Sequence, residues 1–113
     1  MHEYSLASAL LERVEQEARA RKASTVHGLV VSIGDLAGVE PELFDGAWSL
    51  CREGTICADA TLRIERVGAL WECADCGRRI LPGEVLRCAI CGTAARLSAG
   101  DEIVLERIEM EVP

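Results

Sequence analysis

The chain has 113 residues, the length of one domain or of one domain with a small insert. Half of its residues are hydrophobic but only 4% are aromatic, so the apolar content suits aliphatic packing better than the stacking of nucleotide bases. Twelve basic and nineteen acidic residues give a net charge of −7, which argues against a nucleic-acid-binding protein because phosphate contacts need clustered Lys and Arg.

Residues 4–20 predict an amphipathic helix. Apolar side chains recur there at helical spacing, at positions 6, 7, 10, 11, 14 and 18, and charged residues occupy most positions between them. The next segment, Val26–Ile33, is short and rich in β-branched residues, and the turn sequence Gly-Asp-Leu-Ala-Gly ends it, so we expect a β-strand. Its buried side is predicted to consist of Leu29, Val31 and Ile33.

Pro41 suits the first turn of a second helix, with Glu40 before it at the N-cap position. Apolar side chains at positions 44, 47, 48 and 51 follow at helical spacing and share one face. Cys51 continues this face, so we expect it to be a small buried core residue. Gly54 is expected to end the helix.

Two later segments, residues 61–67 and 107–112, alternate between apolar and polar side chains and predict half-exposed strands. The order of elements predicts an α+β fold, with a small three-stranded sheet covered by two helices. Residues 68–98, which we call the cysteine segment, interrupt this fold before the last strand, and Gly100-Asp101 is a plausible turn after them. The cysteine segment has too few apolar residues to fold without other support.

The cysteine segment contains one motif twice, as Cys73-Ala-Asp-Cys76-Gly and Cys88-Ala-Ile-Cys91-Gly. Two thiolates at this spacing can face one point while backbone N–H groups stabilise the sulfurs, and the following glycine can adopt the positive φ of the turn. Four thiolates match a closed tetrahedral zinc site of the zinc-ribbon or rubredoxin-like type. We therefore predict a structural zinc ion whose binding folds this segment. A closed site has no open position for an activated water, so we predict no catalysis there.

Three other interpretations of the cysteines stay open. A mononuclear rubredoxin-like iron fits the same spacing and would colour the protein. A thioredoxin-type redox pair lacks the expected strand-to-helix context, and a disulfide framework is typical of secreted chains. Neither a secretory signal nor a membrane span can be drawn from the sequence, so we expect a cytoplasmic protein.

The amino terminus is the second chemically distinctive feature. The α-amine of Met1, the backbone nitrogen of His2 and the imidazole Nδ1 of His2 can close adjacent chelate rings on one metal ion, and Glu3 can supply a fourth ligand. Nickel(II) and copper(II) favour square-planar nitrogen sets of this kind. The same three residues also suit a plain solvated chain end. His27, the other histidine, is expected to be a surface residue without a role.

These features together resemble the HypA/HybF family, the nickel metallochaperones of NiFe hydrogenase maturation. The resemblance covers essentially the whole chain and is carried by the Met1–Leu6 start of the first helix, the Ser32–Gly34 strand end, Glu40 with Leu43–Phe44, and the paired cysteine motifs. It implies a nickel-binding α/β domain formed by residues 1–67 and 99–113, and a zinc-binding subdomain formed by residues 68–98.

The resemblance also implies ligands and partners. Nickel would be bound by Met1, His2 and Glu3, with Glu40 near that site, and zinc by Cys73, Cys76, Cys88 and Cys91. The implied partners are the nickel-handling GTPase HypB, the hydrogenase large-subunit precursor and, in some organisms, urease and its accessory proteins. Such a protein is not an enzyme and is expected to bind neither nucleic acid nor membranes. The sequence does not decide between a monomer and a homodimer.

Two other functions are compatible with the residues alone. A zinc-ribbon protein-interaction module would bind zinc but no stoichiometric nickel. A thiol redox protein would show reversible dithiol oxidation and little bound zinc. A nickel carrier, in contrast, needs an exposed site that takes up the ion and releases it to another protein.

Overall fold

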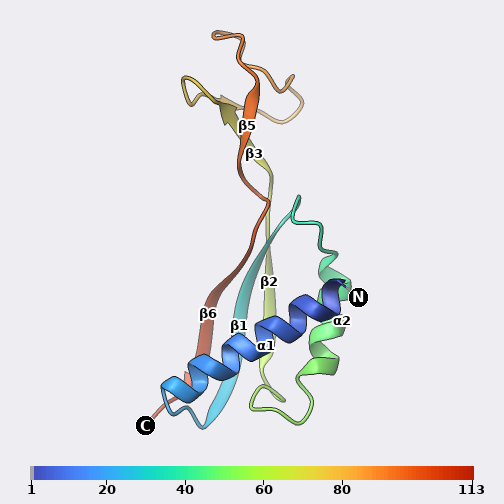
Figure 1. Cartoon of the computed structure of the whole chain (residues 1–113), viewed down its shortest axis with the longest axis vertical. Helices are drawn as coiled ribbons and strands as arrows, with labels where there is room; N and C mark the ends of the chain where they lie inside the picture. Colours follow the sequence, from blue (N-terminus) through green and yellow to red (C-terminus); the bar gives the residue numbers. More distant parts are fainter. Residues whose placement is uncertain (1) are drawn as a thin grey trace.

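The computed structural model describes residues 2–113, which form two α-helices and six β-strands. The elements are α1 (His2–Ala20), β1 (Thr25–Gly34), α2 (Pro41–Cys51), β2 (Thr61–Val67), β3 (Leu70–Cys73), β4 (Arg79–Ile80), β5 (Ala95–Ala99) and β6 (Ile103–Glu111). The molecule is elongated, with extents of 55 × 30 × 17 Å. Its two sheets lie at opposite ends of the long axis, and both helices lie beside the same sheet (Figure 1).

The first sheet has the order β2-β1-β6 and confirms the expected α+β fold. The central strand β1 pairs in parallel with β2 and antiparallel with β6. Parallel neighbours need a crossover connection, and α2 with the turns after it supplies that connection. Leu29, Val31 and Ile33 are buried as expected, but Val30 and Ser32 are buried as well. The predicted one-sided burial of β1 is therefore wrong, because a central strand is flanked by neighbouring strands along both edges.

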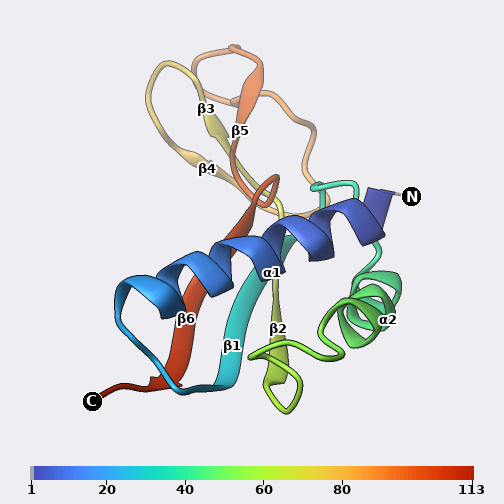
Figure 2. The same ribbon diagram turned by 60° about the horizontal axis from the view of Figure 1, so that its bottom comes forward.

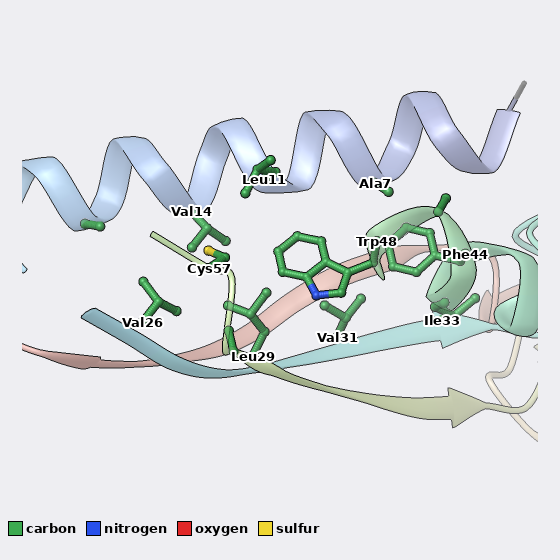
Figure 3. Close-up of a cluster of buried hydrophobic side chains, with 13 residues drawn as sticks. Ala7, Leu11, Val14, Val26, Leu29, Val31, Ile33, Phe44, Trp48 and Cys57 are labelled. Carbon is green, nitrogen blue, oxygen red and sulfur yellow. The ribbon is translucent and has the colours of Figure 1, made fainter. Parts of the chain in front are cut away.

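The hydrophobic core lies between the helices and one face of the first sheet (Figures 2 and 3). From α1 it receives the small or aliphatic side chains that recur every three or four residues, namely Ala7, Leu11, Val14 and Ala18. From α2 it receives Phe44, Ala47 and Trp48. Each fully buried large side chain of this kind contributes about 1.5–3 kcal/mol through the hydrophobic effect. The core of the molecule is thus built by the segments on either side of the cysteine segment.

The second sheet, with the order β4-β3-β5, is formed by the cysteine segment and one further residue. Its strands are short, and in this segment only Cys73, Ile80 and Cys88 are buried. The sequence did not predict these strands. Three buried side chains, two of them cysteines, agree with the expectation that this segment has little hydrophobic support of its own.

Two extended connections join the sheets, and they meet where β1 ends (Figure 1). Gly100 has a φ of +103°, and a Cβ atom there would lie 2.6 Å from the Cα of Ala69 on the other connection. A Cβ on Gly34 would lie 2.2 Å from the carbonyl carbon of Gly100. The backbones therefore touch because neither glycine carries a side chain. The last strand begins soon after this crossing, at Ile103, and is longer than the sequence predicted.

Among residues 2–113, no helix combines the length and the apolar character that crossing a membrane requires.

Candidate metal centres

The four motif cysteines converge at one point of the cysteine segment. Their sulfur atoms all lie within 4.8 Å of one another, and Cys76 Sγ lies 3.9 Å from Cys88 Sγ. Four ligands at a zinc–sulfur distance of about 2.3 Å in a tetrahedron are about 3.8 Å apart. The observed spacing therefore fits one tetrahedral ion held by four sulfurs, which leaves no open coordination position.

Each motif folds into the same tight turn around its first sulfur. The backbone N–H of Cys76 donates to Cys73 Sγ, and that of Cys91 donates to Cys88 Sγ, both at 3.4 Å. The glycines that follow, at positions 77 and 92, have φ values of +76° and +69° and donate their N–H groups to the carbonyls of the first cysteines. This is the arrangement that the spacing predicts. The two turns thus present stabilised sulfurs to a shared centre.

The sulfurs differ in their electrostatic surroundings. The backbone N–H of Cys91 and then the guanidinium of Arg78 lower the pKa of Cys88 to about 6. The sulfurs of Cys76 and Cys73 raise the pKa of Cys91 to about 12. Cys88 therefore loses its proton readily, whereas the neighbouring sulfurs make it harder for Cys91 to lose its own. A bound cation relieves that opposition, because it favours the charged form of every sulfur that faces it.

The remaining two cysteines lie apart from this cluster, and all six thiols are free of disulfides. Cys51 packs against the core, as expected, but is only partly buried. Cys57 is completely buried, and burial raises the pKa of its thiol to about 11. A thiol with this pKa stays protonated at neutral pH and is a poor nucleophile and metal ligand.

The second candidate centre lies where the helices begin. Glu3, in the first turn of α1, accepts a hydrogen bond from the backbone N–H of Glu40 through Oε2 at 3.3 Å. The pKa of the Glu3 carboxyl is lowered, first by a hydrogen bond from its own backbone N–H and next by the hydrogen bond from the backbone N–H of Glu40. The contact brings together two residues that are 37 positions apart in the sequence. Both are at or near the surface, as is His2.

The structure supports the two candidate centres unequally. Among residues 2–113, the four cysteines are the one group of three or more His, Cys, Asp or Glu side chains close enough together to hold a metal ion. His2, Glu3 and Glu40 are not gathered to that degree, and Met1, the other expected nickel ligand, lies outside the described residues. His27 is exposed at the start of β1, as expected.

Sequence reasoning missed two side chains beside the cysteines. Thr93 donates a hydrogen bond from Oγ1 to Asp75 Oδ2, which links the two motifs. Arg78 directly follows the first motif, and its Nε and Nη2 atoms are buried. The position of Arg78, immediately after a Cys-x-x-Cys-Gly motif, could have indicated that it lies beside the cysteines. In the sequence alone it could not be told from an ordinary charged surface residue.

Comparison with known proteins identifies the family. The family model described as "Hydrogenase/urease nickel incorporation, metallochaperone, hypA" matches residues 1–110. The chain belongs to the HypA family. The HypA hydrogenase maturation factors of Wolinella succinogenes and Aquifex aeolicus are each 37% identical to it. Their alignments cover 98% and 99% of this chain and 96% and 99% of the relatives.

Solved HypA structures share the fold as well. The solution structure of the Ni metallochaperone HypA from Helicobacter pylori is 30% identical, covers 98% of both chains and has a TM-score of 0.74. Another HypA solution structure is 32% identical, covers 97% of this chain and 96% of that one, and has a TM-score of 0.81. HypA proteins are maturation factors and metallochaperones rather than enzymes, so the predicted family and the predicted class of protein are both confirmed.

Proposed function

We propose that this HypA family member binds Ni(II) at its amino terminus and delivers it during maturation of NiFe hydrogenase, while a structural Zn(II) ion holds the cysteine segment together. The observation that carries the nickel part is the hydrogen bond from the backbone N–H of Glu40 to the carboxylate of Glu3, which joins the residue before α2 to the first turn of α1, where His2 lies. The family match supports the same function. Residues 1–67 and 99–113 would form the nickel unit, and residues 68–98 the zinc unit.

The zinc assignment rests on the chemistry of the donor set. Cys73, Cys76, Cys88 and Cys91 offer four soft sulfur ligands, which favour zinc over hard cations such as magnesium. The ion would supply folding free energy and no activated water, because all four positions are taken by protein sulfurs.

The nickel assignment rests on exposure and ligand type. The α-amine of Met1, the nitrogens of His2 and the carboxylate of Glu3 would form the nickel site, and Glu40 would lie beside it. His2 is exposed, and a site at the surface allows another protein to approach and take the ion. The Glu3 carboxylate, held next to Glu40, is kept ionised and so is available as an oxygen ligand.

The proposed partners follow from hydrogenase maturation. We expect a nickel-handling GTPase of the HypB type to supply or accept the ion, and the hydrogenase large-subunit precursor to receive it. The family description also names urease, so urease and its accessory proteins are a second candidate route. Six free thiols agree with a reducing compartment, which supports a cytoplasmic location.

The test is a nickel titration of untagged protein, followed by visible absorption and calorimetry, because a tag on Met1 would remove the α-amine. We expect one nickel per chain in the wild type and none in His2→Ala. His27→Ala is the matched control, because it removes an exposed histidine away from the amino terminus, and it should bind as the wild type does. All three proteins should retain one zinc.

Equal nickel binding by the wild type and His2→Ala, or none by either, would show that the nickel site is misassigned. If zinc is still present in that case, a zinc-ribbon interaction module is the better account. The absence of zinc from wild-type protein purified without chelators would contradict the zinc assignment instead.

A further inference from the structure

Strand β6 forms one edge of the first sheet. In the order β2-β1-β6 it pairs with β1 on one side, and among residues 2–113 no strand pairs with its other side. The outward N–H and C=O groups of an edge strand can pair with a further strand. With nine residues, β6 offers a longer edge than β2, which has seven and lies at the opposite edge.

A groove runs along this edge, because α1 crosses the sheet and its second half overhangs β6 (Figures 1 and 2). The groove has a volume of about 880 Å³ and lies between the side chains at positions 13, 17 and 21, in and just after α1, and residues 105–110 of β6. Leu105, Ile108 and Met110 pack against the core but are only partly buried. A further strand along β6 would shield these apolar side chains from water.

A β-bulge in β6 decides which strand fits this edge. Adjacent residues of β1, Val30 and Val31, pair with Arg107 and Leu105, so Glu106 is an extra residue in β6. The extra residue reverses the alternation of side chains along the strand. Core-facing side chains therefore have odd numbers before the bulge and even numbers after it.

Two contacts show where the side chains at the bulge point. Glu106 Oε1 accepts a hydrogen bond from Ser32 Oγ at 2.8 Å, and Ser32 lies between two core residues of β1 and so faces away from the helices. Arg107 Nη2 lies 3.5 Å from Oε1 of Glu109, which alternates with two core-facing residues. Glu106 and Arg107 therefore both face away from the helices, although they are adjacent in the sequence.

We infer that β6 is a dimerisation edge, along which a second copy of this chain adds its own β6 in antiparallel orientation and forms a continuous six-stranded sheet. The twofold axis lies between Glu106 and Arg107. The residues that face each other are Ile103 and Met110, and Leu105 and Ile108, on the helix side, and Val104 and Glu109, and Glu106 and Arg107, on the other side. Apolar residues thus meet in the groove, and opposite charges meet at the axis.

The bulge makes this edge complementary to itself, which favours a second copy over a different protein. Residues that lie opposite each other in antiparallel strands point to the same face, so in a regular strand the axis would pass through one residue. Glu106 would then face Glu106, or Arg107 would face Arg107, and the like charges would repel. With the extra residue, the axis falls between the two and each glutamate faces an arginine.

The dimer leaves the start of each α1 exposed. The hydrogen bond from Glu40 to Glu3 holds the start of α1 beside the start of α2, and both lie across the sheet from β6 (Figure 1). The two proposed nickel sites would therefore lie at the outer sides of the dimer. The pairing itself needs neither metal ion.

The experiment measures the oligomeric state of the full-length, untagged protein by sedimentation velocity at concentrations up to about 100 μM, where we expect the wild type to dimerise. Arg107→Glu gathers only carboxylates at the axis, and Glu106→Arg gathers only guanidinium groups. Each variant should raise the dissociation constant of the dimer at least about tenfold. An equimolar mixture of the two variants restores both opposite-charge pairs and should dimerise as the wild type does.

Arg63→Glu is the matched control at the other edge of the sheet. Arg63 in β2 is exposed and lies 3.6 Å from Glu65, much as Arg107 lies 3.5 Å from Glu109. The substitution changes the net charge as Arg107→Glu does, but it is remote from the axis. It should leave the dimer intact.

A wild type that stays monomeric at about 100 μM would overturn the inference, as would a dimer that neither β6 variant weakens or that Arg63→Glu weakens equally. A mixture of Arg107→Glu and Glu106→Arg that stays monomeric would also overturn it. If a variant does not fold, hydrogen exchange of the wild type decides. The amides of β6 should gain protection as the protein concentration rises, and unchanged protection would contradict the pairing.

Discussion

Cys57 is enclosed by aliphatic side chains beneath α1, close to Val14, Val26 and Leu29 (Figure 3). Burial first, and then the negative charge of Glu15, raise the pKa of this thiol from 9.0 to about 11. The folded state therefore holds the proton more tightly than the unfolded state does. By linkage, the stability that this group contributes is fully present below pH 9 and is lost as the pH rises toward 11.

We expect the free energy of unfolding of the wild type to fall between pH 9 and 11, with a contribution from Cys57 of at most about 3 kcal/mol. Cys57→Ala should be less stable at neutral pH, because a cavity forms, but its stability should fall less over this pH range. Urea denaturation at a series of pH values measures both curves. If the stability of the two proteins changed in parallel with pH, the pH dependence could not be assigned to Cys57.

At the residue scale, the sequence predicted those features of the site that depend only on the spacing of residues close together in the chain. The four sulfurs converge as the Cys-x-x-Cys-Gly motifs predicted, because the geometry of each turn is contained in five adjacent residues. The contact of Glu3 with Glu40 could not be derived from the residues alone, because it depends on how α1 and α2 pack. Only the resemblance to HypA pointed to it. Arg78 was missed because its burial depends on the fold of the segment 79–88.

At the scale of elements, hydrophobic periodicity located both helices and the strands of the first sheet. It failed for β3, β4 and β5, which are short and bury almost nothing apolar. The strand that periodicity predicted for β6 was also too short, because the pairing of β6 with β1 shifts register between Val30 and Val31. Such a shift changes which side chains point inward and so interrupts the alternation that predicts a strand.

Helix α1 packs closely against α2, and its Ala7 is small and fully buried in the core. We expect Ala7→Leu to destabilise the protein by about 1–3 kcal/mol, because a larger side chain must push the helix away from the core. This lowers the melting temperature by at least about 5 °C. The control is Ala9→Leu in the same helix, at an exposed position, and it should cause no such decrease. A similar decrease in both variants would mean that α1 does not pack as described.

At the scale of the whole molecule, the chain is far from spherical. Its radius of gyration is 18.0 Å, whereas a compact chain of this length has one of about 13 Å. The buried core cluster contains no residue of the cysteine segment. The two sheets therefore depend on separate sources of stability, the first on hydrophobic burial and the second, as we propose, on its metal ion.

Removal of the metal should accordingly unfold one sheet and spare the other. The two tryptophans report the sheets separately, because Trp48 lies in the main core and Trp71 lies in β3. In Trp71→Phe, a strong chelator should leave the emission of Trp48 unchanged. In Trp48→Phe, the same chelator should shift the emission of Trp71 to longer wavelength. Hydrogen exchange of the wild type provides a check without substitutions, and loss of protection in β1 would contradict this expectation.

The meeting of the two connections at Gly100 and Ala69 also bears on the order of assembly. Strand β6 can join β1 only after the chain has returned through residues 68–102, and closing a flexible loop costs more entropy as the loop lengthens. Once the cysteine segment is rigid around a metal ion, only a few flexible residues separate β2 from β6. That shortening lowers the cost of closure by about 2 kcal/mol. Metal uptake before β6 pairs with β1 would therefore ease completion of the first sheet, whose stability still comes from hydrophobic burial.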